Sequence, residues 1–254
     1  YTQVRARMNE IRQGGNEGLT GWMESTANVT LYKEWGAFAD THTLKVGDQH
    51  ISGKHIYINT GTRATAPPLE GIDDVPWLDN SALLDLEELP DHLLIIGGGY
   101  IGMEFSQMFR RFGAKVTVVQ SNDRIMPQED TDVSSEIQRF LEAEGVEILC
   151  NTAAKAVTQD KDGRITLTTE RNGKPETLAG SHLLISAGRK PNSDHLNLAV
   201  AGIEPTSRGH IPVDDCCQTS VEGVFAIGDV NGNGAFTHTS VHDSEVVLDY
   251  LFGG

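Results

Sequence analysis

The sequence is short of cysteine and of long apolar runs, and each shortage excludes a class of protein. Three cysteines, Cys150, Cys216 and Cys217, are too few for a disulfide framework and have no second pair at zinc-ligand spacing. We therefore expect a reducing, cytoplasmic setting. No hydrophobic run approaches the roughly 18 to 20 residues of a membrane-spanning helix, and the first residues lack the apolar stretch of a signal peptide. We therefore expect neither a membrane-spanning helix nor a signal peptide.

Basic residues are also scarce relative to acidic ones. The 254 residues hold 20 Lys and Arg against 36 Asp and Glu, a formal net charge of −16. This charge repels nucleic-acid phosphates and anionic lipid surfaces, so we predict no nucleic-acid partner and no membrane partner. Solubility or adaptation to high salt are further explanations of the acidity that the sequence does not separate.

The first part of the chain combines one helical pattern with short β-type runs. Val4, Met8 and Ile11 recur at helical spacing, which predicts a short amphipathic helix ended by Gly14 and Gly15. Between residues 28 and 59, the runs VTLY, HTLKV and HIYIN are separated by turn residues and predict a small antiparallel meander. The proline-rich run TAPPLEGIDDVP then indicates a crossing between two domains.

Strands and helices alternate beyond that crossing, which is the pattern of a parallel sheet with crossover helices. We predict strands at 92–96, 115–119, 146–149 and 182–186, and helices at 100–112 and 132–144. The second helix places on one face Val133, Ile137, Phe140 and Leu141. The turn pairs Asp162-Gly163 and Asn172-Gly173 predict a three-stranded hairpin insert. A run VFAIGDV and a C-terminal helix follow.

Three glycines give the strongest chemical signal. Gly97, Gly99 and Gly102 form G-x-G-x-x-G directly after a buried strand and at the start of a helix. There the first glycine allows a tight turn, the second lets a pyrophosphate approach the backbone, and the third lets helix and strand pack closely. The context predicts a dinucleotide site, with a ligand-free glycine turn as the alternative.

The residue after the second strand bears on the choice of nucleotide. An acidic side chain commonly stands there and hydrogen-bonds the ribose 2′-hydroxyl, but this sequence has Gln120. A neutral amide tolerates a 2′-phosphate that a carboxylate repels, and Arg124 is near enough in sequence to bind one. In the alternative, Gln120 bonds the diol and Arg124 is a solvated loop residue. The pattern favours NADPH slightly.

The runs HLLIIGGGYIGMEFSQMFRRFGAKVTVV, SAGRKPN and VFAIGDV together resemble the FAD-dependent pyridine nucleotide-disulfide oxidoreductases, and the likeness covers essentially the whole chain. Within that family, YINTGTRATAPPLEGI, EFSQMFRRFG and AFTHTS are most similar to the mercuric-reductase-like branch. The resemblance implies an α/β fold. A Rossmann-like NAD(P)-binding domain with a parallel sheet and a three-stranded β-meander (84–190) would be inserted in an incomplete FAD-binding domain (1–83 and 191–254).

The resemblance also implies cofactor contacts. For NAD(P)H these are Gly97, Gly99, Tyr100, Ile101, Gly102, Gln120 and Arg124, with Tyr100 as an aromatic gate over the flavin. Glu104 matches a glutamate with a supporting catalytic role, which pairs with a lysine beside the flavin. The FAD contacts are Trp35 and Gly36 at the adenine, Thr60 and Gly61 at the diphosphate, Gly188 and Arg189 lining both sites, Gly228 and Asp229 at the ribityl chain, and Thr237 and His238 near the ring.

Several parts of the family pattern do not occur in these residues. The FAD-binding fingerprint, the C-x4-C redox pair and the C-terminal dimerisation domain with its His-Glu base are missing, so we expect a fragment that is inactive alone and binds FAD weakly or not at all. His238 is read as structural rather than as a base. The pair Cys216-Cys217 suits soft metal ions, yet it stands where the family has ordinary strand residues, so we predict no metal site.

The resemblance implies a function for the complete protein, expected to be a homodimer. Hydride passes from NAD(P)H to FAD, and electrons then reach a thiol pair and a small-molecule or metal-ion acceptor such as a disulfide or Hg(II). Dihydrolipoamide dehydrogenase and soluble transhydrogenase are alternatives within the enzymes, and a non-catalytic NAD(P)-binding module is an alternative of another class. A short-chain dehydrogenase is disfavoured because no Y-x-x-x-K follows the fingerprint.

Overall fold

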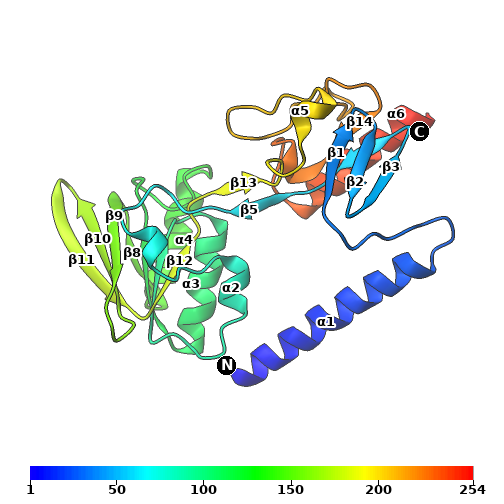
Figure 1. Ribbon diagram of the computed structural model, residues 1–254. Helices are drawn as coiled ribbons and strands as arrows, with labels where there is room; N and C mark the ends of the chain where they lie inside the picture. The colour runs from blue at the N-terminus through cyan, green and yellow to red at the C-terminus, as the bar shows by residue number, and fades with distance from the viewer. Residues whose placement is uncertain (254) are drawn as a thin grey trace. The chain divides into compact units, whose positions relative to one another are not determined.

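A computed structural model describes residues 1–253, which divide into two compact units (Figure 1). The first unit holds Tyr1–Glu17 and Ala64–Gly188, and the second holds Gly18–Arg63 and the chain from Arg189 onward. The predicted nucleotide-binding domain, 84–190, lies in the first unit apart from its last two residues. Among the described residues, no helix is long and apolar enough to cross a membrane.

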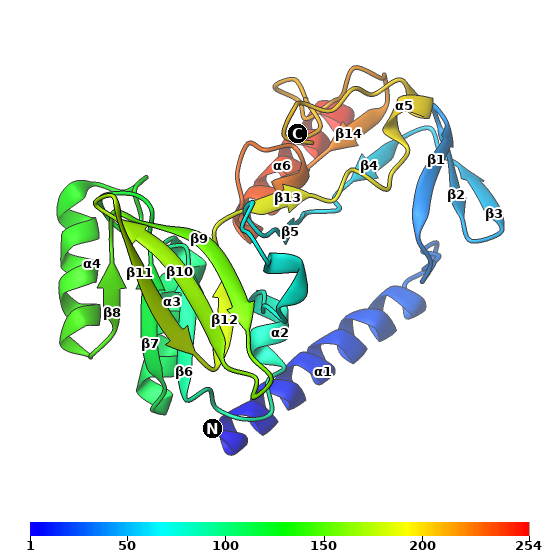
Figure 2. The same cartoon turned by 60° about the vertical axis from the view of Figure 1, so that its left-hand side comes forward.

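A four-stranded parallel sheet of order β12-β6-β7-β8 forms the centre of the first unit (Figure 2). Its strands are β6 (His92–Ile96), β7 (Lys115–Val119), β8 (Glu147–Leu149) and β12 (His182–Ile185). The crossover helices are α3 (Tyr100–Phe112) and α4 (Thr131–Ala143), and β6 is preceded by η1 (Ile72–Asp74) and α2 (Asn80–Leu84). The bounds of β6, α3 and β7 are those predicted from sequence.

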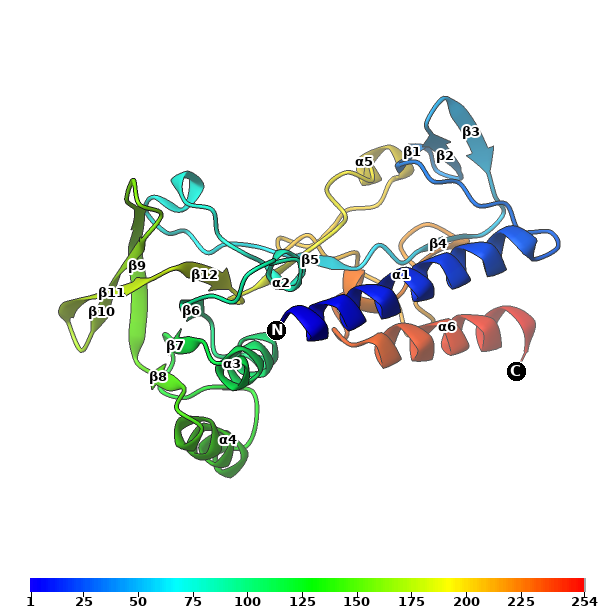
Figure 3. The ribbon, with the colours of Figure 1, turned by 90° about the horizontal axis from the view of Figure 1, so that it is seen from below.

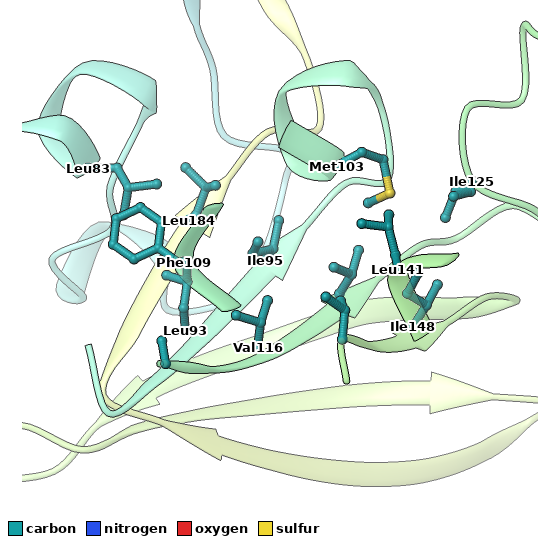
Figure 4. Packing of buried hydrophobic residues seen from close by; sticks show 13 residues of the cluster. Leu83, Leu93, Ile95, Met103, Phe109, Val116, Ile125, Leu141, Ile148 and Leu184 are labelled. Atoms are coloured by element: carbon teal, nitrogen blue, oxygen red, sulfur yellow. The ribbon is translucent and has the colours of Figure 1, made fainter. Parts of the chain in front are cut away.

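Both faces of this sheet are buried. The helices α3 and α4 cover one face, and an antiparallel sheet of order β11-β10-β9 covers the other (Figure 3). The helix side packs Leu93, Ile95, Val116 and Leu184 against Met103, Phe109 and Leu141 (Figure 4). The other side packs Leu94, Ile96 and Val119 against Val157, Ile165 and Leu167. Successive residues of β6 therefore point to opposite, equally apolar layers, which explains its continuous hydrophobic sequence.

The antiparallel insert confirms the two predicted turns. Its strands are β9 (Thr152–Gln159), β10 (Ile165–Arg171) and β11 (Lys174–Gly180). At the second turn, Asn172 and Gly173 both have positive φ, 53° and 75°. Asn-Gly is the pair that accommodates two left-handed residues in a two-residue hairpin.

The second unit contains three small sheets. The antiparallel meander is β1 (Gly36–Asp40), β2 (Thr43–Val46) and β3 (Gln49–Ser52); the other two pairs are β4 (Ile56–Ile58) with β14 (Val224–Ala226), and β5 (Thr62–Ala64) with β13 (Arg189–Pro191). The remaining elements are α5 (Leu198–Ala201), η2 (Gly228–Val230) and the predicted C-terminal helix α6 (Thr237–Phe252).

An antiparallel meander is present as predicted, but two of the three predicted runs do not belong to it as expected. The run VTLY (29–32) forms no strand, and HIYIN supplies β4, which pairs in parallel with β14 instead of joining β1–β3. The reason is burial, because Ile56 and Ile58 enter a core that also holds Val224 and Ala226. A long-range apolar contact outweighs the local hairpin pattern.

The first helix is longer than predicted. Helix α1 spans Thr2–Ser25 and passes through Gly14 and Gly15 without ending. A glycine ends a helix when it takes the left-handed conformation, and neither of these has positive φ. The Nε2 atom of Gln13 donates to Oε1 of Glu17 at 2.8 Å across the glycine pair, and such i,i+4 pairs favour continuation. The prediction of a glycine stop was wrong.

Helix α4 presents a different face from the one predicted. Leu141 is buried as expected and Ile137 packs partly against the core, but Val133 and Phe140 are 42% and 37% exposed. Ser134 is buried in their place, and its Oγ donates to the carbonyl oxygen of Met126 at 3.1 Å. That hydrogen bond ties the start of α4 to the preceding loop and accompanies the observed rotation of the helix.

Candidate functional site

The glycine fingerprint forms the turn between β6 and α3. Gly97 has φ +108°, and an added Cβ there would lie 2.6 Å from the carbonyl oxygen of Ser186. At Gly102 it would lie 2.1 Å from the carbonyl oxygen of Gly97. These two glycines are therefore required by packing of the protein on itself, as the pattern predicts for a tight turn and a close helix.

Gly99 differs from its two neighbours in the fingerprint. It is the N-cap residue of α3, it supplies no capping side chain, and an added Cβ would meet no atom within 4 Å. The first N–H groups of a helix and its dipole favour an anion at that position. Open space at Gly99, with Tyr100 and Ile101 following, fits the approach of a pyrophosphate.

A loop that follows β7 is tied to this turn. The backbone N–H of Met126 donates to the carbonyl oxygen of Gly98 at 2.7 Å, and the N–H of Glu129 donates to that of Met126 at 2.9 Å. The Tyr100 hydroxyl donates to Oε1 of Glu129, and this hydrogen bond raises the pKa of Tyr100. The structure thereby connects the aromatic residue at the start of α3 to a carboxylate that sequence reasoning missed. Its sequence position, 29 residues downstream, gives no local signal.

The Gln120 side chain is buried and makes hydrogen bonds within the protein. It is 7% exposed, Oε1 accepts from the Gly98 N–H at 3.4 Å, and Nε2 donates to the Arg124 carbonyl oxygen at 3.3 Å. The amide therefore stabilises the turn, and its contact with a ribose stays a prediction. Arg124 donates from Nη2 to Pro127 O at 3.0 Å and lies 3.8 Å from Asp123, while its buried Nε has no partner among the described residues.

Glu104 lies on the exposed side of α3. A surface hollow of about 290 Å³ is lined by Glu104, Gln107, Met108, Arg111 and Phe112, all from this one helix. Within residues 1–253, the Glu104 carboxylate makes no side-chain hydrogen bond or ion pair. The supporting catalytic role of Glu104 stays a prediction.

The second unit brings three distant motifs together at one polar cluster. Asp229 Oδ2 accepts from Thr62 Oγ1 at 2.7 Å, and Thr62 Oγ1 accepts from Arg189 Nε at 2.7 Å. Arg189 Nη2 also donates to the Thr62 carbonyl oxygen at 2.8 Å. We call Arg189, Thr62 and Asp229 the acidic relay. Thr62 is its central residue, and sequence reasoning, which singled out Thr60 and Gly61, did not include it.

Asn192 holds the neighbouring turn. Thr60 Oγ1 donates to the Asn192 carbonyl oxygen at 2.9 Å, and Asn192 donates back from Nδ2 to Thr60 O at 2.8 Å and from its backbone N–H to Gly61 O at 2.9 Å. Gly61 has φ +67°, which favours glycine. Asn192 ends the AGRKPN run, so its motif was recognised although the residue was not selected.

Charge pairs flank the relay. Arg63 donates to both carboxylate oxygens of Asp194, at 3.1 and 2.5 Å, and Lys190 donates to one of them at 2.9 Å. The hydrogen bonds from Arg63 and then Lys190 hold the pKa of Asp194 well below its usual range. The segment after β13 is thereby fastened to β5 beside Thr62.

Other predicted flavin contacts are not joined to this cluster by hydrogen bonds within the described chain. Trp35 is 87% exposed just before β1, where Gly36 begins the strand, and Gly188 is exposed before β13. Thr237 and His238 begin α6, where the His238 ring stacks on Phe236 with centroids 5.3 Å apart. Gly228 precedes Asp229 with φ +68°.

The adjacent cysteines have different surroundings. Cys217 is buried among Phe225, Ile227 and Val247, and burial raises the pKa of its thiol to about 11. Cys216 is partly exposed. A raised pKa disfavours the thiolate that binds metals. Over the described residues, no group of three or more His, Cys, Asp or Glu side chains is arranged to hold a metal ion.

Comparison with known proteins decides the family. A family model described as pyridine nucleotide-disulphide oxidoreductase matches residues 3–244. The chain belongs to this family. The resemblance noted in the sequence is therefore confirmed, together with the α/β fold and the Rossmann-like domain.

Relatives in the family carry several names. The probable pyridine nucleotide-disulfide oxidoreductase RclA of Escherichia coli K12 is 36% identical over 89% of this chain and 51% of its own length. A mercuric reductase of Bacillus cereus is 34% identical over 88% of this chain and 35% of its own length. A dihydrolipoyl dehydrogenase of Geobacillus stearothermophilus is 34% identical over 98% of this chain and 54% of its own length. The chain spans about half the length of these relatives or less.

A solved structure agrees with the fold. The HOCl-induced flavoprotein disulfide reductase RclA from E. coli matches with a TM-score of 0.93 at 34% identity, over 99% of this chain and 57% of that chain. Because relatives with different named activities match at similar identity, the mercuric-reductase-like branch stays a prediction.

Proposed function

We propose that this chain supplies the NAD(P)H site and part of the FAD site of a flavoprotein oxidoreductase that passes hydride from NAD(P)H to FAD and electrons on to a thiol, disulfide or Hg(II)-type acceptor. The observation that carries the proposal is the acidic relay. Thr62 lies more than a hundred residues before Arg189 and Asp229 in the sequence, yet its hydroxyl meets a guanidinium and a carboxylate at one point, in a different unit from the fingerprint turn.

The chemistry of hydride and electron transfer belongs to the two cofactors when they are bound. The protein's own residues would bind and orient them. The N-terminus of α3 at Gly99 would hold the pyrophosphate of the nucleotide, and Tyr100, held by Glu129, would cover the approach to the nicotinamide. Asp229, whose Oδ2 accepts from Thr62, would hold the flavin ribityl chain by accepting a hydrogen bond from one of its hydroxyl groups.

The acceptor is proposed to be of the mercuric-reductase type, with a homodimeric, cytoplasmic complete protein. Dihydrolipoamide dehydrogenase activity is the second candidate, because a relative of that name is similar over 98% of the chain. Oxidation of NADPH dependent on Hg(II), set against reduction of NAD⁺ by dihydrolipoamide, separates the two in the full-length protein.

For the nucleotide we propose NADPH. No acidic side chain directly follows β7, and the Arg124 Nε is buried without a partner in residues 1–253. Arg124→Ala should raise the KM for NADPH about tenfold and leave the KM for NADH within twofold, since an arginine-phosphate pair is lost only for NADPH. Equal changes in both constants would assign Arg124 to loop structure alone.

The decisive experiment is the visible absorption spectrum of the full-length protein before and after anaerobic NADPH. A flavin band near ~450 nm that bleaches supports the proposal. A colourless protein that binds NADPH contradicts it and favours a non-catalytic nucleotide-binding module. The 254 residues alone should bind FAD weakly or not at all, because their one fingerprint lies in the other unit from Asp229; stoichiometric FAD on this chain would contradict that expectation.

A further inference from the structure

We propose that Asp243 is a positioning residue for the flavin, holding the turn η2 so that Asp229 presents its carboxylate to the ribityl chain. The inference rests on the proposed function and deepens it, because Asp243 itself touches no cofactor.

The contacts of Asp243 bracket Asp229. Asp243 lies on α6, is 7% exposed, and its Oδ2 accepts from the Gly228 N–H at 2.8 Å and from Asn231 Nδ2 at 2.9 Å. Gly228 directly precedes Asp229, and Asn231 follows it by two residues. One oxygen therefore fixes the chain on both sides of Asp229.

The Asp243 carboxyl group is buried, so it needs hydrogen-bond partners within the protein. Burying a carboxylate is costly unless hydrogen bonds or a cation compensate, and within the described chain Asp243 has no ion pair. Its compensation comes from the two donors of the η2 segment. Removing the acceptor would leave both donors unsatisfied at a buried position, which is the cost that holds η2 against α6.

Helix α6 also contacts the segment that leads to Thr62. Ser240, one turn before Asp243, donates to Asn59 Oδ1 at 3.2 Å, directly before the Thr60–Gly61 turn. An added Cβ at Gly228 would lie 2.9 Å from that same Asn59 oxygen and 3.0 Å from Ser240 Cβ. The η2 turn is thus wedged between α6 and the strand that leads to Thr62, and Asp243 secures it there.

The result is a carboxylate with one oriented oxygen. Asp229 Oδ2 is held by Thr62 at 2.7 Å, and Oδ1 has no hydrogen-bond partner among the described residues. If η2 shifted, the distance between Asp229 and Thr62 would change and Oδ1 would lose its direction. Hydrogen bonds to a flexible sugar-alcohol chain depend on such preorganisation.

The test measures the FAD dissociation constant of the full-length protein after removal and readdition of flavin. Asp243→Leu keeps the branching and the number of side-chain heavy atoms, although leucine is larger, and it leaves both donors without an acceptor, so it should raise the constant about tenfold or more. Asp243→Asn retains an oxygen that can accept both bonds and should stay within about threefold of the parent. The matched control is Asp249→Leu, the same change at an exposed position of α6, and it should have no effect.

A double-mutant cycle separates positioning from general stabilisation of α6. If Asp243 acts through Asp229, then Asp243→Leu added to Asp229→Asn should raise the FAD dissociation constant less than twofold further. Equal factors in both backgrounds, or an unchanged constant in Asp243→Leu alone, overturn the inference. If Asp243→Leu does not fold, Asn231→Ala takes its place. This substitution removes one of the two donors, and it is combined with Asp229→Asn in the same way. A parent protein without FAD binding is a different result, which refutes the proposed function and the inference with it.

Discussion

Gly99 and Gly102 lie three residues apart in one turn, yet an added Cβ atom meets opposite surroundings at the two positions. It finds open space at Gly99 and a backbone oxygen 2.1 Å away at Gly102. The same motif thus contains one glycine that packing requires, Gly102, and one, Gly99, whose open surroundings leave room for the proposed ligand. Sequence pattern alone assigns both roles by analogy, whereas the geometry assigns each from its own neighbours.

Alanine substitutions should separate these roles. Gly102→Ala should lower the free energy of unfolding by about 1–3 kcal/mol or more, because the backbone has to move to admit a methyl group. Gly99→Ala should leave it within about 0.5 kcal/mol but weaken NADPH binding about tenfold or more, because the methyl occupies the pyrophosphate approach. Urea denaturation and NADPH fluorescence titration measure the two quantities. Full NADPH affinity in Gly99→Ala would remove the phosphate assignment.

Histidines at the start of two neighbouring strands give a pH dependence. Burial lowers the pKa of His92 and of His182 below the ordinary value of 6.5, and Lys115 lowers that of His92 further. A depressed histidine pKa means that the unfolded chain binds protons more readily, so stability is present above pH 6.5 and decreases as the pH falls below it.

This effect should appear as a lower urea midpoint at pH 5.5 than at pH 7.5. His92→Gln keeps a polar group near Thr117 Oγ1, which lies 2.9 Å from His92 Nε2, and should reduce the pH difference. The Asp194 carboxylate acts in a separate window, since its lowered pKa contributes stability that is lost only as the pH falls below about 3.8. An identical pH difference in His92→Gln would show that other groups titrate.

At the scale of elements, sequence reasoning succeeded where one strong local pattern agreed with tertiary packing. The strand β6 is apolar on both faces, α3 begins at the fingerprint, and the Asn172-Gly173 turn needs two left-handed residues. It failed where the hydrophobic pattern did not show the contacts that decide. The pairing of β4 with β14 depends on a partner distant in sequence. The length of α1 and the rotation of α4 accompany short-range hydrogen bonds, Gln13 with Glu17 and Ser134 with Met126.

The same limit applies to the candidate site. The fingerprint glycines and Asp229 were found because each lies in a recognisable run. Thr62, Glu129 and Asp243 were missed because their importance comes from hydrogen bonds to residues elsewhere in the sequence. A threonine, a glutamate or a buried aspartate has no sequence signature of its own, so only the fold reveals them.

The rotation of α4 is open to a direct test with two adjacent residues. Leu141 is 1% exposed and Phe140 is 37% exposed, although the sequence placed both on the core face. Leu141→Ala should lower the free energy of unfolding by about 2–5 kcal/mol, and Phe140→Ala by about 1 kcal/mol or less. Urea denaturation compares them, and a larger loss from Phe140→Ala would reverse the assigned face.

At the scale of the whole molecule, the excess of acidic residues predicts a response to salt. A formal charge of −16 destabilises the compact state through self-repulsion, and screening weakens that repulsion. The thermal midpoint should therefore rise between about 0.05 and 0.5 M NaCl, where the Debye length shortens from roughly 14 to 4 Å. A sucrose series of equal osmolality is the control, and a rise of equal size in sucrose would point away from charge.

The polypeptide enters and leaves the first unit's long segment at almost the same place. The N–H of Thr65 donates to the carbonyl oxygen of Gly188 at 3.2 Å, so the two ends of a stretch of more than a hundred residues are hydrogen-bonded neighbours. Closely spaced ends are what allow a domain to be accepted as an insertion by a host fold. The ends of this stretch therefore lie close enough for a short peptide to join them. A circular permutant, or an insertion of residues 65–188 into a loop of another protein, would need only a short linker.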